Sequence, residues 1–352
     1  MTGRERIARV LRRQPVDRVP ITEAHFWPET LAAWRDQGLP ADADPWAFFE
    51  LENATVGYEQ SLRRPYELLE EAEDWVIDRG TDGVVRKQWR SHTGIPQPLE
   101  FPVRDPADWP AIKSEMAFTP DRIAANIGEQ VAAHHALGRF VFLAASEPCF
   151  QVWRLMGGEA FFYAFHDYPD LVCDIMDTIV ESWQAAWGEI SRREIPVDGI
   201  WISGDLAYKN GPWMSPRQFE QLILPRHKRI ADYFNERDLP VMWHCCGDVR
   251  QLVPFVAESG LSALQPLEAR AGNDIRELKP LYGDRLTFMG NIQVEKLSAD
   301  RETTREEVLS KLTVAMQGGG YMFSSDHSVP PHVTFDNYTY AIELVKQHGR
   351  YD

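Results

Sequence analysis

Cysteine is scarce in this sequence of 352 residues, where it occurs at positions 149, 173, 245 and 246 only. Two of the four are adjacent, and their spacing fits no disulfide framework. No apolar run approaches the length that spans a bilayer. The N-terminus leads into a charged segment and not into the apolar region of a signal peptide. We therefore expect a cytoplasmic protein with reduced thiols and no membrane partner.

Positive charge is also in short supply, since 37 Lys and Arg stand against 53 Asp and Glu, for a net charge of −16. Nucleic-acid binding requires clustered Lys and Arg, so we expect no nucleic-acid partner. Hydrophobic residues make up 44% of the chain and charged residues 26%, the balance of a globular protein with a large core. The composition suits an enzyme that acts on a small molecule, and it is compatible with a homodimer.

Low-complexity stretches, internal repeats and Gly/Ser linkers are missing too, so we expect one catalytic domain over residues 1–352. Residues 4–14 predict an amphipathic helix, with Thr2 as its N-cap. From about residue 139 onward, short apolar runs alternate with long segments of helical periodicity. The predicted strands are residues 18–23, 140–145, 199–203, 241–244, 263–267, 286–289 and 321–324, and the clearest helices are residues 169–193, 216–237 and 305–317.

Strands that alternate with helices predict parallel strands joined by right-handed crossovers. An eighth strand must come from residues 48–60, where the signal is poor. Residues 74–90 alternate with period two around a turn, which predicts an inserted β-hairpin. We therefore expect an α/β fold, a (β/α)₈ TIM barrel with an inserted N-terminal β-hairpin. The alternative is an open doubly wound sheet, but no Gly-x-Gly-x-x-Gly or Walker sequence supports a nucleotide site in such a sheet.

The most informative residues follow the predicted strands, because barrel enzymes carry their reactive groups at the C-terminal ends of strands. Side chains alternate along a strand, so His244 and Cys246 point to the same side and Cys245 to the other. An imidazole and a thiolate in this arrangement can bind one zinc ion. The competing interpretation makes His244 a hydrogen-bonded barrel residue and Cys246 a small buried one.

A zinc site needs a third protein ligand, and His327 at the tip of the last strand is our candidate. His332 follows two prolines and is better explained as a loop residue. Glu23 and Glu147 also lie at strand ends, where each is a ligand, a general base or a buried hydrogen-bonded acid. Catalytic roles are assigned to Asp205, which follows another strand, and to Glu147.

Several further residues near strand ends are candidates for contact with a substrate. The loop after residue 204 is rich in polar groups and in glycine and proline, although a solvated loop would look the same. Tryptophans on or after strands can line an aromatic-binding pocket, although core packing is the commoner explanation. The candidate substrate-binding residues are Glu23, Trp27, Tyr208, Lys209, Asn210, Trp243 and Asn291.

These motifs together resemble the uroporphyrinogen decarboxylase superfamily over nearly the whole chain. The resemblance is carried by Asp17-Arg18-Val19-Pro20, by Asp205 with Met214-Ser215-Pro216 and Leu224-Pro225, by His244-x-Cys246-Gly247-Asp248, by Gly290-Asn291 and by Gly318-Gly319-Gly320-Tyr321. It implies a (β/α)₈ barrel. The decarboxylases of this superfamily share an Arg-Gln-Ala-Gly-Arg motif after the first strand, which binds the acidic porphyrinogen. Residues 21–26 contain no arginine, and Glu23 would repel a polycarboxylate, so porphyrinogen decarboxylation is not expected.

Another branch of the superfamily contains zinc-dependent methyltransferases that work with corrinoid proteins. Their zinc is held by a His-x-Cys pair, which His244 and Cys246 match, and by a cysteine near the tip of the last strand. Here His327 takes that position. One thiolate in place of two makes the metal a stronger Lewis acid, which favours an oxygen leaving group.

The resemblance therefore implies transfer of a methyl group from a small-molecule methyl ether, such as a methoxylated aromatic compound, to cobalamin. The chain has no Asp-x-His-x-x-Gly signature of a corrinoid-binding domain, so cobalamin would arrive free or on a partner corrinoid protein. Two alternatives remain: a lyase that decarboxylates a smaller acid at the metal or at Asp205, and a non-catalytic barrel that binds a small molecule.

Overall fold

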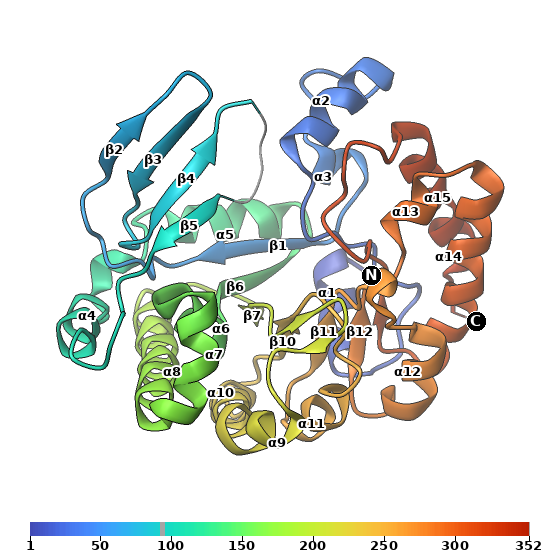
Figure 1. Cartoon of the computed structure of the whole chain (residues 1–352). Coiled ribbons are helices and arrows are strands. Elements are labelled where there is room, and N and C mark those ends of the chain that lie inside the picture. Colours follow the sequence, from blue (N-terminus) through green and yellow to red (C-terminus); the bar gives the residue numbers. More distant parts are fainter. Residues whose placement is uncertain (92–95, 352) are drawn as a thin grey trace. The chain divides into compact units, whose positions relative to one another are not determined.

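The computed structural model describes residues 1–91 and 96–351, and the chain divides into two compact units. The barrel unit comprises Met1–Val56, Asn126–Ala144 and Ile195–Asp352, and the second unit comprises Gly57–Ala125 and Ala145–Glu194. Figure 1 shows the elements of both. The single catalytic domain expected from the sequence stays a prediction.

The strands are β1 (Asn53–Gly57), β2 (Glu67–Glu71), β3 (Trp75–Arg79), β4 (Val85–Trp89), β5 (Gln97–Glu100), β6 (Phe140–Ser146), β7 (Gly199–Ser203), β8 (Ala207–Tyr208), β9 (Gly211–Pro212), β10 (Val241–His244), β11 (Ala263–Gln265), β12 (Thr287–Met289) and β13 (Tyr321–Met322). The helices are α1 (Gly3–Leu11), α2 (Pro28–Gln37), α3 (Pro45–Phe48), α4 (Trp109–Glu115), α5 (Ile127–Ala136), α6 (Pro148–Met156), α7 (Gly158–Asp167), α8 (Pro169–Arg192), α9 (Pro216–Gln218), α10 (Leu224–Asn235), α11 (Val253–Glu258), α12 (Ile275–Tyr282), α13 (Val294–Leu297), α14 (Arg301–Ala315) and α15 (Phe335–His348). Three short helical turns complete the list, η1 (Pro120–Arg122), η2 (Phe219–Ile223) and η3 (Ala269–Ala271).

The main sheet has seven strands in the order β1-β6-β7-β10-β11-β12-β13, which is also their order along the chain. The pairs from β7 through β13 are parallel, as strands joined by helical crossovers must be. In Figure 1 the helices that follow these strands lie around the outside of β10, β11 and β12. Strand β1 confirms the eighth strand predicted within residues 48–60.

Residues 20–22 take the place of the predicted first strand and join the two edges of the sheet. Phe323, just after β13, donates its amide to the carbonyl of Pro20 and accepts from the amide of Thr22, both at 2.9 Å. On the other side, the amide of Glu52, just before β1, donates to the carbonyl of Ile21 at 2.9 Å. The segment makes only isolated bridges, partly because proline has no amide proton. The fold is a TIM-barrel-like α/β fold.

Helix α1 packs against side chains from six of the strands and forms the core with them. Its Ile7, Val10 and Leu11 belong to one buried cluster with residues that alternate along the strands: Phe140, Phe142, Trp201, Met242, Ala263, Met289 and Met322. Thr2 caps the helix in a reciprocal pair with Glu5, which confirms the predicted helix and its N-cap. The alternation identifies the residues two positions further along each strand as inward-facing.

The second unit contains a four-stranded antiparallel sheet in the order β2-β3-β4-β5. The register of β3 and β4 pairs Trp75 with Trp89, which confirms the predicted hairpin and places it at the centre of a larger sheet. Helix α8 packs against α4, α6 and α7 in the same unit. Among the described residues, no helix combines the length and the apolar character needed to cross a membrane.

Candidate metal centre

Three neighbouring strands of the barrel end at the same level. The sheet register pairs Ser203 of β7 with His244 of β10, and His244 with Gln265 of β11. All three face inward, since each lies two residues beyond a core residue of its strand. Asp205 and Cys246 each follow two residues after the paired positions of β7 and β10. The sheet therefore brings these two loop residues together.

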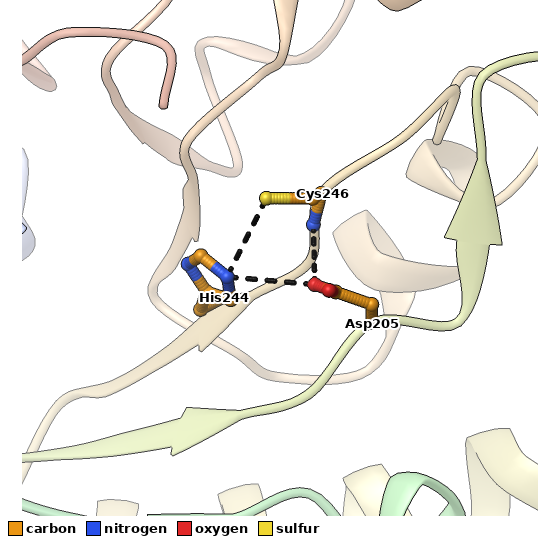
Figure 2. A group of neighbouring side chains, drawn as sticks. All are labelled: Asp205, His244 and Cys246. Carbon is orange, nitrogen blue, oxygen red and sulfur yellow. Dashed lines mark hydrogen bonds and ion pairs between the residues drawn. The ribbon is translucent and has the colours of Figure 1, made fainter. Parts of the chain in front are cut away.

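Asp205, His244 and Cys246 form a compact group in which one ligand atom from each residue lies within 4.8 Å of the others. Nε2 of His244 is 3.4 Å from Oδ1 of Asp205 and 3.6 Å from Sγ of Cys246. The amide of Cys246 donates to Oδ1 of Asp205 at 2.8 Å. Figure 2 shows the three side chains pointing toward a common centre. Carboxylate, imidazole and thiolate are the donor types that zinc binds in proteins, so these residues fit the metal.

Gln265 fixes the orientation of the His244 ring. Its Oε1 contacts Nδ1 of His244, and the side chain of Gln265 is almost completely buried. An amide oxygen only accepts hydrogen bonds, so neutral His244 carries its proton on Nδ1. Nε2 is then left with a free electron pair on the side of Asp205 and Cys246. This is the arrangement by which an outer hydrogen bond prepares a histidine for a metal.

The backbone around the cysteine pair is held tightly to the loop that carries Asp205. Gly247 has a φ of +87°, and a Cβ there would lie 2.6 Å from the carbonyl carbon of Ala207, so glycine is required. Cys245 is fully buried, and its Sγ accepts the amide of Leu206 at 3.2 Å. The structure therefore confirms that the two adjacent cysteines point in different directions.

The charges in the group support one another in the absence of a metal. Burial opposes a proton on His244, but Cys246 and Asp205 outweigh it and raise the pKa of His244 well above its usual value. Burial also opposes the charge on Asp205, yet His244, the Cys246 amide and His327 together lower its pKa. Burial raises the pKa of the Cys246 thiol despite the attraction of His244. The site therefore favours a positive charge between two acidic groups.

His327 lies near the group without belonging to it. His327 contributes to the lowered pKa of the Asp205 carboxyl. Among the described residues, however, the group whose ligand atoms all lie within 4.8 Å of one another consists of Asp205, His244 and Cys246. Nδ1 of His327 is 3.2 Å from the carbonyl oxygen of Ser328. Its role as third ligand stays a prediction. His332 is exposed, as expected of a loop residue.

The two glutamates at strand ends are fully buried and hydrogen-bonded. Glu23 accepts hydrogen bonds from Ser324, Ser325 and Tyr338, and burial raises its pKa. This position within the protein favours a structural role over contact with a substrate. Glu147, in the second unit, is the N-cap of α6 and accepts the amide of Phe150 at 2.6 Å. Its catalytic role stays a prediction.

Trp243 and Asn291 are also used inside the protein. Trp243 faces outward from β10, as alternation requires, and its ring packs on Phe219 and His227. Its Nε1 donates to the carbonyl of Gly204 at 3.2 Å. The side chain of Asn291 accepts one backbone amide and donates to two backbone carbonyls. These contacts support packing and loop-positioning roles, and the predicted substrate contacts stay a prediction.

The remaining substrate candidates are more accessible. Tyr208, Lys209 and Asn210 are exposed at the turn of the hairpin formed by β8 and β9, which directly follows Asp205. Trp27 is partly buried at the N-terminus of α2, and its Nε1 has no protein partner among the described residues. These four residues remain candidates for contact with a substrate.

Two features of the site were not predicted from the sequence: the contact of Gln265 with His244, and the proximity of Asp205 to Cys246. Gln265 was visible only as a polar residue at a strand end, although its place opposite His244 follows once β10 and β11 are taken as neighbours. The proximity of Asp205 to Cys246 could have been found in the same way. Both residues stand two positions beyond the ends of adjacent strands.

Comparison with known proteins identifies the family of the chain. The family model described as Uroporphyrinogen decarboxylase (URO-D) matches residues 154–348, more than half of the chain. The chain belongs to the uroporphyrinogen decarboxylase family. This URO-D family member is similar to the uroporphyrinogen decarboxylase of Hydrogenovibrio crunogenus, with 23% identity over 357 residues that cover 94% of the chain and 92% of the relative.

Other relatives of this URO-D family member differ in their named activity. The methylcobamide:CoM methyltransferase MtbA of Methanosarcina mazei is 24% identical over 278 residues, or 75% of each protein. The uroporphyrinogen decarboxylase of Carboxydothermus hydrogenoformans is 27% identical over 134 residues, and the match spans only 37% of that relative. The chain is thus an enzyme of the URO-D family with a methyltransferase among its relatives.

A solved structure supports the same fold. A methyltransferase from Methanosarcina mazei superposes with a TM-score of 0.68 over 99% of both chains, at 16% sequence identity. At this identity the similarity concerns the fold alone. Together with the strand order it confirms the TIM-barrel-like architecture of this URO-D family member.

Proposed function

We propose that this protein is a zinc-dependent methyltransferase that moves a methyl group from a small methyl ether, such as a methoxylated aromatic compound, to cob(I)alamin. The proposal is carried by one observation: a histidine, a cysteine and an aspartate converge at the ends of two adjacent barrel strands. Overall, the bond between the methyl carbon and the ether oxygen breaks with its electron pair left on oxygen. Cobalt(I) provides the electron pair of the new bond to carbon, and the oxygen takes up a proton.

The donor set favours oxygen as the leaving atom. Among the described residues, Cys246 is the only thiolate in the group, because Sγ of Cys245 is directed to the amide of Leu206. When bound, zinc would supply Lewis acidity toward the developing negative charge on the ether oxygen. A thiolate is a softer and stronger electron donor to zinc than a carboxylate or an imidazole, so a site with one thiolate leaves the metal a stronger Lewis acid than a site with two.

Each protein residue then has a defined task. His244 and Cys246 would hold the metal, and Gln265 keeps Nε2 of His244 directed at it. The side chains of His244 and Asp205 are 22% and 37% exposed, which leaves room for a substrate on the solvent side. Tyr208 and its neighbours on the exposed hairpin would contact the substrate from the same loop as Asp205.

The methyl acceptor would come from outside the chain. The sequence has no Asp-x-His-x-x-Gly signature, so cobalamin would be free or carried by a corrinoid protein. The MtbA relative is named for methylcobamide, which supports a corrinoid in the proposed reaction. We propose that a corrinoid protein is the partner in the cell.

Decarboxylation of a smaller acid is the second candidate, because two of the relatives named above are uroporphyrinogen decarboxylases. The surroundings of the site argue against a polycarboxylate. Residues 21–26 contain no arginine, and two arginines in the loops after β10 and β11 are already paired. Arg250 makes a two-point contact with Asp248, and Arg270 contacts Glu268.

The test is direct. Purified protein loaded with zinc is mixed with chemically reduced cobalamin and a panel of methoxylated aromatic compounds, and methylcobalamin is followed by its absorption spectrum. We expect formation with at least one ether and none with Cys246→Ala. Release of CO₂ from an aromatic acid without any methylcobalamin would support decarboxylation and reject the methyltransferase.

A further inference from the structure

The distances within the group match those of a tetrahedral zinc site with three protein ligands. For zinc bonds of roughly 2.0–2.3 Å, tetrahedral geometry gives nitrogen–oxygen and nitrogen–sulfur separations of about 3.4 Å and about 3.6 Å. The observed separations from Nε2 of His244 are 3.4 Å to Oδ1 of Asp205 and 3.6 Å to Sγ of Cys246. Both separations from the imidazole nitrogen therefore have the values expected of a tetrahedral site, and all three ligand atoms lie within 4.8 Å of one another.

We infer that Asp205, and not His327, is the third protein ligand, so that the site takes a divalent metal of intermediate softness through one nitrogen, one sulfur and one oxygen. The inference deepens the proposed function, since it rests on the metal which that function requires. A carboxylate and a thiolate together balance the charge of a divalent cation, with His244 neutral. Zinc and cobalt(II) suit this mixed donor set better than magnesium or calcium, which prefer oxygen alone.

Asp205 is held in position by the protein before a metal binds. The amide of Cys246 donates to Oδ1 at 2.8 Å, which fixes one ligand relative to another. That oxygen has a second electron pair available for a metal. The loop itself is anchored, because the amide of Leu206 donates to Sγ of Cys245 and the amide of Asp248 donates to the carbonyl of Tyr208 at 3.0 Å.

The fourth corner of the tetrahedron is left to a ligand from solvent. Asp205 and His244 both expose part of their side chains, whereas Gln265 behind His244 is buried. An open position on the exposed side is the feature that distinguishes catalytic from structural zinc sites. His327, on this inference, faces the site near Asp205 without binding the metal.

The experiment measures metal binding without methyl transfer. Wild type, Asp205→Ala, Asp205→Asn and His327→Ala are titrated with zinc against a chromophoric chelator, and cobalt(II)-loaded samples are compared by visible absorption, which reports the coordination number. Asp205→Asn keeps an acceptor for the Cys246 amide, so it separates ligation from positioning. We expect both Asp205 variants to lose more than the roughly 10–100-fold that loss of an outer hydrogen bond costs. His327→Ala should stay within about tenfold of wild type.

Two exposed residues provide matched controls, Asp238→Ala and His332→Ala, which should bind zinc as wild type does. Circular dichroism verifies that each variant is folded, and the Asn variant decides the result if the Ala variant is not. Loss of metal in His327→Ala with full binding in both Asp205 variants would overturn the inference, as would a wild type that binds no zinc. A protein that binds zinc through Asp205 but forms no methylcobalamin would reject the proposed function and leave this inference intact.

Discussion

Two adjacent cysteines differ completely in their surroundings. Sγ of Cys246 faces Nε2 of His244, whereas Cys245 is buried against the amide of Leu206. We expect about one zinc per chain in wild type and none in Cys246→Ala, measured by elemental analysis after dialysis. Cys245→Ala should retain the metal, although it leaves a small cavity. Equal loss in the two variants would show that the alternation along β10 does not determine the ligand.

Gln265 is expected to act on the metal through His244. Gln265→Leu removes the acceptor for Nδ1, so the ring loses its fixed orientation, and zinc affinity should fall roughly 10–100-fold. Gln265→Glu keeps an acceptor at the same place and should bind zinc nearly as wild type does. Competition with a chromophoric chelator measures both. Unchanged affinity in the Leu variant would mean that the contact with Gln265 does not prepare the site.

Metal affinity should depend strongly on pH. Burial raises the pKa of the Cys246 thiol, so the thiol is protonated near neutral pH, and Asp205 favours a proton on His244 against the opposing effect of burial. Zinc binds the thiolate and the neutral imidazole, so binding releases protons, and its affinity should rise by about tenfold per pH unit for each proton displaced. Calorimetry in buffers of different ionisation enthalpy counts the protons released. A dissociation constant that does not change between pH 6 and pH 8 would contradict this protonation state.

The sequence predicts candidate site residues at each strand end separately, but it does not predict which residues from neighbouring strands lie together. His244 and Cys246 stand out because a short apolar run ends in them, and alternation assigns both to one side. Asp205 and Gln265 could not be joined to them by local pattern alone, since their contacts depend on the register between neighbouring strands. The substrate contact predicted for Trp243 stays a prediction, although the same alternation directs its side chain away from the barrel interior.

At the scale of elements, strands were predicted well where they are central and apolar. Strands β7 and β10 have the predicted bounds, because each is a short apolar run between polar loops. The strands β2 and β5 were missed. The segment Glu67–Glu71 is exposed throughout and lacks alternation, and Gln97–Glu100 contains Pro98, which cannot donate to a ladder.

Helix α12 carries a buried lysine whose positive charge is less favourable in the folded protein than in the unfolded chain. Lys279 is buried and donates to the carbonyl of Gly320 at 3.4 Å and to that of Gly319, while burial and Arg13 lower its pKa from 10.5 to about 8. Between these values the unfolded chain binds more protons than the folded one, so stability rises with pH. From pH 8 to pH 10 this contribution amounts to about 2 kcal/mol.

Lys279→Met should remove that rise, which urea unfolding at the two pH values measures. Lys296→Met, at an exposed position of α13, is the control and should leave the pH dependence unchanged. A rise that persists in Lys279→Met would assign the pH dependence to other groups.

At the scale of the whole molecule, one buried ionic group links the N-terminal segments of the barrel unit. Glu52 is almost fully buried and contacts Arg6 of α1, while its Oε1 accepts from Arg18 at 2.6 Å and from the amide of Ile21 at 3.0 Å. Glu52→Ala leaves Arg6 buried without this partner and should cost about 3–5 kcal/mol of unfolding free energy. Asp336→Ala breaks an exposed pair with Arg301 and should cost less than about 1 kcal/mol. Similar losses in both variants would show that this buried group does not stabilise the barrel unit.

The barrel itself was predictable because its strands and helices alternate in order, and the match to the Methanosarcina mazei methyltransferase confirms it. The strand at residues 53–57 was predicted only because a closed barrel needs eight strands and seven had already been assigned. Its start is hard to predict because the buried Asn53 is of a residue type that strands disfavour. Residues 20–22 close the sheet through backbone hydrogen bonds, which cannot be predicted from the pattern of side chains.

The pairing of Ser203 with His244 has a consequence for how such a site can change. Neighbouring strands are held about 4.8 Å apart by their hydrogen bonds, so the sheet sets the spacing of the two strand ends from which the donor residues follow. Exchanging one donor for another, as in Asp205→Cys, would alter the softness of the site without changing the charge of the bound donors or moving the backbone. A single amino-acid substitution can then redirect the chemistry of the barrel from one class of leaving group to another.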